Sequence, residues 1–165
     1  MVVPEKQPAV EKEQGRGNGL PERVIVSEKV KYRLAGIVGA DRILTSHEDL
    51  MVYAYDATLP EYLPEVVVFP RDAAQVAEIM KLANAERIPV VPRGAGTNLS
   101  GGSLPLHGGI VLGLARMNRI LEVDKENLTA VVEPGVVNAD LQVYLAPMGL
   151  FYPPDPASMN ACTIG

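Results

Sequence analysis

The stretch of sequence best suited to chemistry is a glycine-rich segment, PRGAGTNLSGG, at residues 92–102. Gly loses more backbone freedom on folding than any other residue, so a cluster of glycines marks a backbone that must approach a neighbour or ligand closely. Uncovered main-chain N–H groups form a concavity that binds anions, above all phosphate or diphosphate. Further donors are the side chains of Thr97, Asn98, Ser100 and Ser103. A purely structural turn is the alternative, and spacing alone does not separate the two.

Two common phosphate-binding motifs do not fit this segment. A P-loop carries a Lys after its second Gly, whereas the corresponding Gly101 is followed by another Gly. A Rossmann fingerprint needs a third Gly and a helix behind it, but the G-x-G of Gly94 and Gly96 is followed by Leu99 and then by strand-like sequence. A phosphate at this loop must therefore be held in another way.

Composition excludes several classes of function. The chain has 165 residues, of which 47% are hydrophobic and 21% charged, as in ordinary globular domains. A net charge of −5 and an aromatic content of 5% argue against a nucleic-acid partner, which needs basic and stacking groups. One Cys rules out an internal disulfide. No apolar run approaches the ~20 residues of a membrane span. The first residues lack a secretory pattern, so we expect a cytoplasmic protein.

Composition also divides the chain into three parts. Residues 1–23 are rich in Pro, Glu, Lys and Gly and predict a disordered tail. Residues 24–63 predict a helical lead-in. Residues 64–165 hold the Gly-rich loop and alternate between strand and helix patterns. We therefore expect the folded body of the protein to begin at about residue 24.

Two helices are predicted in the lead-in. The first carries apolar residues at helical spacing and ends at a Gly, at position 36 or 39. The second begins near Ser46, because Thr45 and Glu48 stand in a capping-box relation.

A strand–helix–strand unit is predicted just before the loop. The run EVVVFP at 65–70 predicts a buried strand, and Asp72 is placed to cap the helix that follows. The next strand covers 88–91, with Pro92 at its end. The apolar face of the intervening helix consists of Val76, Ile79, Met80 and Ala83. This order predicts a βαβ unit.

Beyond the loop, strand patterns cover 108–114, 119–124 and 128–134. The turn DKEN joins the last two into a hairpin. Asn138 is then expected to cap a helix that ends near Gly149. The elements together predict an α+β fold, with a βαβ unit plus a mixed sheet.

Three motifs in this order resemble one known family. They are VPRGAGTNLSGG (91–102), VEPGV (132–136) and YPPDPASMNACTIG (152–165). Together they resemble the FAD-binding domain of the vanillyl-alcohol-oxidase and p-cresol-methylhydroxylase type, and most of all that of D-lactate dehydrogenase and glycolate oxidase subunits. The segment at 34–58 also resembles the lead-in of those subunits. The resemblance implies the N-terminal part of a two-subdomain FAD-binding domain, truncated here at its C-terminus.

The resemblance also implies a site for FAD. The diphosphate would lie against the Gly-rich loop, with the flavin and its ribityl chain beside the C-terminal segment and the VEPGV turn in support. The cofactor-binding residues that it implies are Pro92, Arg93, Gly94, Ala95, Gly96, Thr97, Asn98, Ser100, Gly101 and Gly102 in the loop, Glu133, Pro134 and Gly135 in the turn, and Pro154, Asp155, Ser158, Thr163 and Gly165 in the C-terminal segment.

Several of these residues have a second interpretation. Arg93 either pairs with phosphate or only solvates the edge of the loop, and Asp155 between two prolines is also a common turn former. Cys162 is interpreted as a small packing residue near the cofactor. His47 and His107 are interpreted as surface or loop residues, although His107 follows the loop closely enough to contact a cofactor. Some relatives bind FAD covalently through a His in the loop, which has none here, so we expect non-covalent FAD.

The activity implied by the resemblance is the oxidation of a 2-hydroxy acid, D-lactate or glycolate, by hydride transfer to the flavin, with electrons passed to partner subunits or other acceptors. In such relatives a C-terminal domain supplies the catalytic residues and any metal ligands. No catalytic or metal-binding residue is therefore assigned here. We expect a fragment that is inactive alone, from a protein in the cytoplasm or held at the inner membrane by partner subunits.

Three alternatives remain at the level of sequence. The first is a complete small FAD- or nucleotide-binding module whose partner chain carries the substrate site. The second is a reductase of the UDP-N-acetylenolpyruvoylglucosamine type on the same fold. The third is a phosphate-binding protein without enzyme activity.

Overall fold

The computed structural model of the chain describes residues 12–13, 23–58 and 60–165. Most of the tail predicted at 1–23 therefore lies outside the described residues. The elements are β1 (Lys12–Glu13), β2 (Arg23–Val24), α1 (Glu28–Val38), η1 (Ala40–Arg42), β3 (Ile43–Leu44), α2 (His47–Met51), β4 (Val66–Val68), α3 (Ala73–Glu86), β5 (Val90–Arg93), β6 (Ile110–Gly113), β7 (Ile120–Asp124), β8 (Thr129–Val132), α4 (Asn138–Leu145) and η2 (Ala146–Met148).

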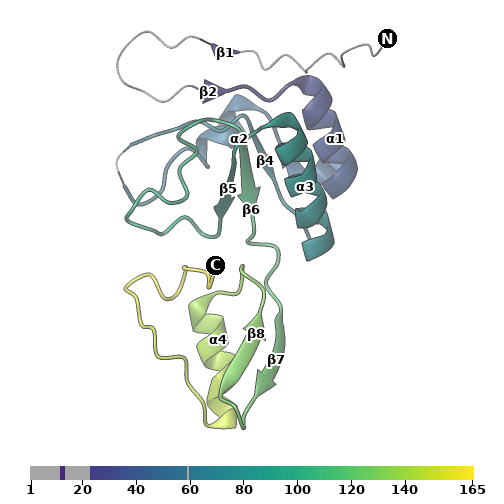
Figure 1. The fold of residues 1–165 in the computed structure, drawn as a ribbon. Helices are drawn as coiled ribbons and strands as arrows, with labels where there is room; N and C mark the ends of the chain where they lie inside the picture. Colours follow the sequence, from purple (N-terminus) through teal and green to yellow (C-terminus); the bar gives the residue numbers. More distant parts are fainter. Residues whose placement is uncertain (1–11, 14–22, 59) are drawn as a thin grey trace.

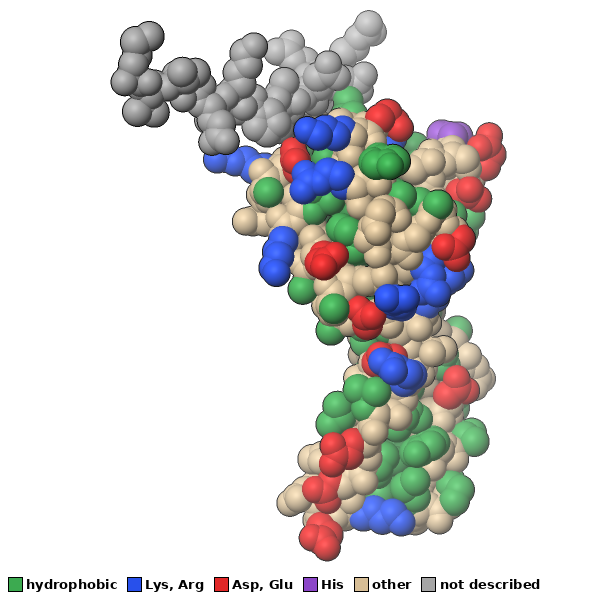
Figure 2. All heavy atoms as spheres, turned by 90° about the vertical axis from the view of Figure 1, so that its right-hand side faces the viewer, with side chains coloured by type: hydrophobic (Ala, Val, Ile, Leu, Met, Phe, Trp, Pro, Cys, Tyr) green, Lys and Arg blue, Asp and Glu red, His purple; other side chains and the backbone are tan. Residues whose placement is uncertain are grey.

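The elements form two lobes, joined by a narrower neck (Figures 1 and 2). The larger lobe holds a four-stranded sheet in the order β3-β4-β6-β5, with α1 and α3 beside it. In this sheet β4, β6 and β5 are parallel, and β3 is antiparallel to β4. The smaller lobe holds the antiparallel hairpin β7–β8 and α4. The predicted α+β class with a mixed sheet is confirmed.

The sheet of the larger lobe is buried on both faces. Val66 and Val68 of β4 pack with residues of α1 and α3, whereas Val67 between them packs with Leu50 of α2 and with Val111 on the opposite face. Alternate side chains of a strand point to opposite faces, so a strand covered on both sides is apolar at every position. This explains the run of three valines.

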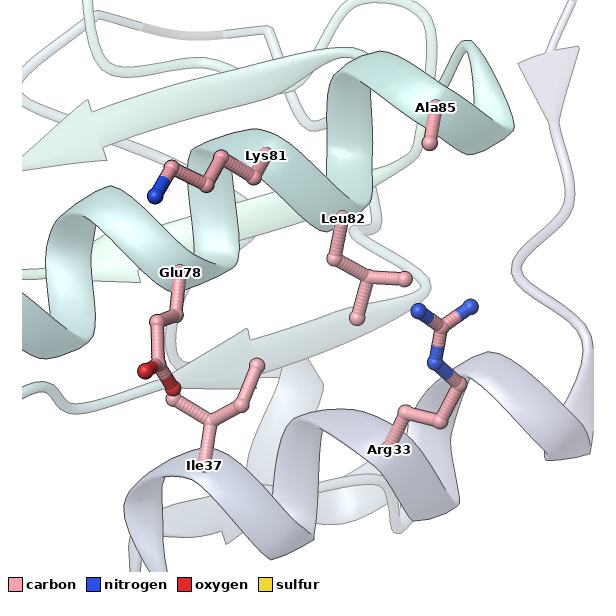
Figure 3. Close-up of a pocket in the computed structure, with 6 residues that line it drawn as sticks. All are labelled: Arg33, Ile37, Glu78, Lys81, Leu82 and Ala85. Atoms are coloured by element: carbon pink, nitrogen blue, oxygen red, sulfur yellow. The ribbon is translucent and has the colours of Figure 1, made fainter.

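Helix α1 packs beside α3 through polar as well as apolar contacts. The Arg33 guanidinium pairs with Glu86 at 2.9 Å, and Gln75 Nε2 donates to the Ile37 carbonyl at 2.7 Å. Figure 3 shows the open pocket between the two helices, about 420 Å³ in volume, with Arg33 and Ile37 on α1 facing Glu78 and Leu82 on α3. None of the predicted site residues lines this pocket.

Most predicted helix ends are confirmed, with two corrections. Gly39 ends α1 at φ +99°, and the Asp72 side chain accepts the Gln75 N–H at 2.9 Å at the start of α3. The predicted capping pair of Thr45 and Glu48 is wrong by one residue. Ser46 caps α2 instead, accepting the N–H of the residue three positions on at 3.2 Å.

The second correction concerns α4. Val137, not Asn138, is its N-cap residue, and no side chain caps it. Asn138 is the first residue of the helix, where it is buried and its Nδ2 donates to the Pro154 carbonyl at 3.1 Å. The Asn138 side chain therefore ties α4 to the C-terminal segment.

The predicted core face of α3 is wrong at one residue. Ile79 and Ala83 are buried as predicted, but Met80 is 45% exposed and Leu82 is buried. Met80 follows Ile79 by about 100° around the helix, which turns it towards solvent.

The predicted strand–helix–strand unit exists, but its two strands are not neighbours. β6 lies between β4 and β5. Pro92 lies inside β5, opposite Leu112, and does not end it. Because β5 is an edge strand, the missing N–H of Pro92 leaves no gap in the hydrogen bonding of the sheet.

The smaller lobe has its own core. The predicted hairpin is confirmed, and Asp124 Oδ1 closes its turn by accepting the N–H groups of Glu126 at 2.9 Å and Asn127 at 3.0 Å. Val136, Leu141 and Leu145 are buried against the hairpin. An apolar cavity of about 520 Å³ remains between β7–β8, α4 and residues 149–153.

Two adjacent residues of α3 give a matched test of the assigned core. We expect Ile79→Ala, which truncates a fully buried side chain, to lower the free energy of unfolding by about 2–5 kcal/mol. Met80→Ala should change it by less than about 1 kcal/mol, because exposed side chains contribute little. Urea unfolding of both variants measures the difference, and equal losses would contradict the assigned core.

Candidate functional site

A cavity of about 430 Å³ lies between the Gly-rich loop and the C-terminal segment. Figure 1 shows the C-terminus beneath the end of β5, where the loop begins. The cavity is lined by Pro92, Gly94, Ala95, Gly96, Thr97, Asn98, Gly102, Ser103, Pro156, Ser158, Cys162, Thr163 and Gly165. Two segments far apart in the sequence are thus brought together.

The loop occupies the carboxyl end of a parallel strand. β5 and β6 are parallel neighbours, so the chain between them must return along the sheet. Residues 94–109 make this return without a helix. Gly96 and Gly101 have φ of +73° and +72°, a conformation that favours glycine. The described part of the chain supplies no acceptor for the backbone N–H groups of residues 96–103, so these donors remain for water or a ligand.

The loop touches the C-terminal segment through Gly94 and Ala95. The Ala95 N–H donates to Thr163 Oγ1 at 3.3 Å, and Thr163 Oγ1 donates to the Gly165 carbonyl at 2.8 Å. A Cβ atom on Gly94 would overlap Thr163 Oγ1 and lie 2.5 Å from the Gly165 oxygen. The contact therefore requires a glycine at position 94.

The VEPGV turn holds the C-terminal segment in place. The N–H groups of Ile164 and Gly165 donate to the carbonyls of Val136 and Pro134, each at 2.8 Å. Val137 and Thr163 form an antiparallel bridge. This pairing positions the wall of the cavity opposite the loop.

Glu133 and Gly135 contact the segment that joins β6 to β7. The buried Glu133 carboxylate accepts the Arg119 N–H at 2.8 Å and the Arg119 Nη2 at 2.7 Å. These hydrogen bonds hold the pKa of Glu133 below its ordinary value. Gly135 donates to the Met117 carbonyl at 2.7 Å, and a Cβ there would lie 2.8 Å from the same oxygen.

Arg93 lies beneath the loop. The residue is 7% exposed, and its Nη1 donates to the Tyr55 carbonyl at 2.7 Å. Its guanidinium carbon lies 5.6 Å from the centre of the Tyr53 ring and occupies the space that a Cβ on Gly96 would need. Burial lowers the pKa of Arg93 from its ordinary value. Arg93 is thus not a solvated group at the loop edge, and it does not line the cavity.

The structure brings most of the predicted loop residues onto the cavity wall, together with Ser158, Thr163 and Gly165. The predicted residues that do not line it are Arg93, Ser100, Gly101, Glu133, Pro134, Gly135, Pro154 and Asp155.

Three residues outside the predicted cofactor-binding set also line the cavity. Ser103 is buried and Cys162 is partly buried; Pro156 is the third. The sequence already indicated Ser103 as a further donor and Cys162 as a packing residue near the cofactor, whereas Pro156 is marked only by its place in the motif at 152–165. Neither His47 nor His107 lines the cavity.

Neither a membrane span nor a metal cluster occurs in the part of the chain that the structure describes. No helix there combines the length and the apolar character that crossing a membrane requires. No group of three or more His, Cys, Asp or Glu side chains in residues 12–13, 23–58 and 60–165 is arranged to hold a metal ion.

The protein family and the relatives that this chain matches agree with one another. The FAD binding domain family matches residues 64–165. The glycolate oxidase subunit GlcD of Bacillus subtilis strain 168 is 45% identical over 143 residues, which are 86% of this chain and 30% of that protein. The D-lactate dehydrogenase of Anaerostipes hadrus is 34% identical over 145 residues, 88% of this chain and 27% of that protein. This chain thus spans less than a third of either relative.

A solved structure of p-cresol methylhydroxylase with substrate bound has the same fold over the matched part. Its TM-score is 0.67 at 28% identity, over 74% of this chain and 25% of that one. The likeness confirms the fold that the three motifs predicted.

Two glycines of the loop provide a matched test of the Thr163 contact. Gly94→Ala places a methyl group where Thr163 Oγ1 and the Gly165 carbonyl now lie. We expect it to lower the free energy of unfolding by about 1–3 kcal/mol, as overpacking does. Gly102→Ala meets no atom within 4 Å and should change stability by less than about 1 kcal/mol. Urea unfolding measures both, and a neutral Gly94→Ala would contradict the contact.

Glu133 predicts a pH dependence. A lowered pKa in the folded state stabilises the fold above the unfolded value of about 4.3, and this stabilisation is lost as the pH falls through the lowered value. Between about pH 6 and about pH 3, we therefore expect Glu133→Gln to lose less unfolding free energy than the wild type, as measured by urea unfolding. The exposed Glu122→Gln serves as control. Identical pH profiles for Glu133→Gln and the wild type would argue against the assigned ion pair.

Proposed function

The chain belongs to the FAD binding domain family, and on that premise we propose that the cavity between residues 92–103 and 156–165 holds the diphosphate of FAD. The observation that carries the proposal is the row of backbone N–H groups at 96–103 that find no acceptor in the described part of the chain. They lie beyond the carboxyl ends of parallel strands, where α/β proteins bind their ligands.

The residues present fit an anionic group. Among the described residues, no Asp or Glu lines the cavity, so no side-chain carboxylate on its wall opposes a diphosphate. The same lining holds no Lys or Arg, so the attraction comes from backbone N–H dipoles and from side-chain donors. The side-chain donors are Thr97, Ser158 and the second Nδ2 hydrogen of Asn98. The hydroxyls of Ser103 and Thr163 already donate to Asn98 Oδ1 and to the Gly165 carbonyl.

We assign roles to the remaining predicted residues from their places in the loop, the turn and the C-terminal segment. We propose that Pro154, Asp155 and Ser158 lie beside the flavin and its ribityl chain. Glu133, Pro134 and Gly135 hold the C-terminal segment, while Arg93, Ser100 and Gly101 shape the loop. We propose that FAD is held without a covalent bond, because the loop at 92–102 contains no His. We also retain residues 24–63 as a lead-in to the FAD-binding domain at 64–165.

For the whole protein we propose the oxidation of a 2-hydroxy acid such as glycolate or D-lactate. When bound, FAD supplies the acceptor for the hydride of the substrate. The residues of this chain bind and orient the cofactor, and we assign none of them a catalytic role. Support comes from the relatives named glycolate oxidase subunit and D-lactate dehydrogenase. These names do not favour a small nucleotide-binding module.

The word subunit in the name of the Bacillus subtilis relative supports a further part of the proposal, that electrons pass to partner subunits. We propose a cytoplasmic location, with any contact to the inner membrane made through those partners.

Binding of FAD tests the proposed function. We expect FAD to bind the purified chain with quenching of flavin fluorescence, and ADP to compete with it because ADP carries the same diphosphate. Riboflavin, which lacks phosphate, should compete at least about tenfold less well, since charge-assisted hydrogen bonds contribute the most to such binding. Acid precipitation should release all of the flavin. Absence of FAD binding, or competition by riboflavin alone, would contradict the proposal.

A further inference from the structure

We propose that Asp56 is a positioning residue of the FAD site, although it lies in the lead-in and outside the stretch matched by the family. Asp56 fixes the turn at 98–103 through a hydrogen bond from Asn98. Its negative charge lies outside the lining of the cavity. The inference rests on the proposed function, and the observation behind it is a chain of hydrogen bonds that runs from the lead-in to the loop.

The Asp56 carboxylate is engaged through both of its oxygens, in a residue that is 6% exposed. Its Oδ1 accepts the N–H of Thr58 at 2.8 Å and the hydroxyl of Thr58 at 2.5 Å. Its Oδ2 accepts Nδ2 of Asn98 at 2.6 Å. The hydrogen bond from the Thr58 hydroxyl is the main cause of the lowered pKa of Asp56, which therefore stays ionised. The carboxylate thus acts as a fixed acceptor for the loop.

This acceptor sets the orientation of the Asn98 amide. Because Nδ2 points to the carboxylate, Oδ1 of Asn98 is left to accept the Ser103 hydroxyl at 2.8 Å. The Asn98 carbonyl also accepts the N–H of Ala57 at 3.3 Å. The turn between Asn98 and Ser103 is therefore closed across its ends and attached to the lead-in. Both of these residues line the cavity.

The placement of charge follows from the same chain of hydrogen bonds. Asn98 on the cavity wall is neutral, and the carboxylate that orients it lies one side chain further back. The buried Arg93, which binds the neighbouring Tyr55 carbonyl, adds a favourable charge interaction with Asp56. A carboxylate moved forward to position 98 would instead face the phosphates and repel them.

An exchange of the two residues separates this role from a merely structural one. In the double variant D56N/N98D, the amide introduced at position 56 can donate to the carboxylate introduced at position 98. That carboxylate can still accept the Ser103 hydroxyl, so the hydrogen bonds are kept while the charge moves to the cavity wall. We expect wild-type thermal stability in this variant but FAD and ADP affinities at least about tenfold weaker than in the wild type. Wild-type affinity in the double variant would overturn the proposal.

Asp56→Ala tests the positioning itself, and Asp124→Ala is its matched control. Like Asp56, Asp124 accepts an Asn Nδ2 at 2.6 Å, and it accepts two backbone N–H groups besides, but it lies in the β7–β8 turn. Measured well below the melting temperature of each variant, Asp56→Ala should weaken FAD binding by about tenfold or more, and Asp124→Ala should leave it unchanged. Equal affinity in Asp56→Ala and the wild type would refute the role of Asp56. Failure of the wild type to bind FAD would instead refute the proposed function.

Discussion

The arrangement of the site depends on one topological constraint, the parallel pairing of β5 with its neighbour β6. Parallel neighbours need a connection that returns the full length of the sheet, and this connection is usually a helix that satisfies its own backbone groups. Here the return at 94–109 is a glycine-rich loop. It therefore leaves backbone N–H groups without partners in the described chain, at the end of the sheet where parallel strands bind ligands. The site can therefore bind an anion because the connection between β5 and β6 is a loop and not a helix.

A loop of this kind needs external support, and three contacts supply it. Thr163 meets the first part of the loop from the C-terminal segment, where Gly94 allows the close approach. Arg93 fills the space beneath Gly96. Asp56 holds the far turn through its hydrogen bond from the Asn98 amide. Two of these supports, Arg93 and Asp56, act through the lead-in segment at 53–58. The lead-in is thus part of the architecture of the site.

Local patterns in the sequence predicted most of the elements, because caps and turns act over a few residues. The Asp72 cap and the Asp124 turn are of this kind. The insertion of β6 between β4 and β5 was not predictable in the same way, since it depends on pairing across the whole sheet. The motifs of the site were likewise predictable from the sequence, but the contacts between their residues were not. The burial of Arg93 and the role of Asp56 emerge only once the chain is folded, because nothing in the local Asp-x-Thr spacing names Asn98 as the partner.

We propose that the loop and the C-terminal segment together bind the diphosphate of FAD. The most direct measurement is a titration of the ¹⁵N-labelled chain with ADP, followed by backbone amide chemical shifts. We expect the largest shifts on the amides of residues 94–103 and 163–165. Shifts confined to the apolar cavity between β7–β8 and α4, or no shifts at the loop, would contradict this proposal.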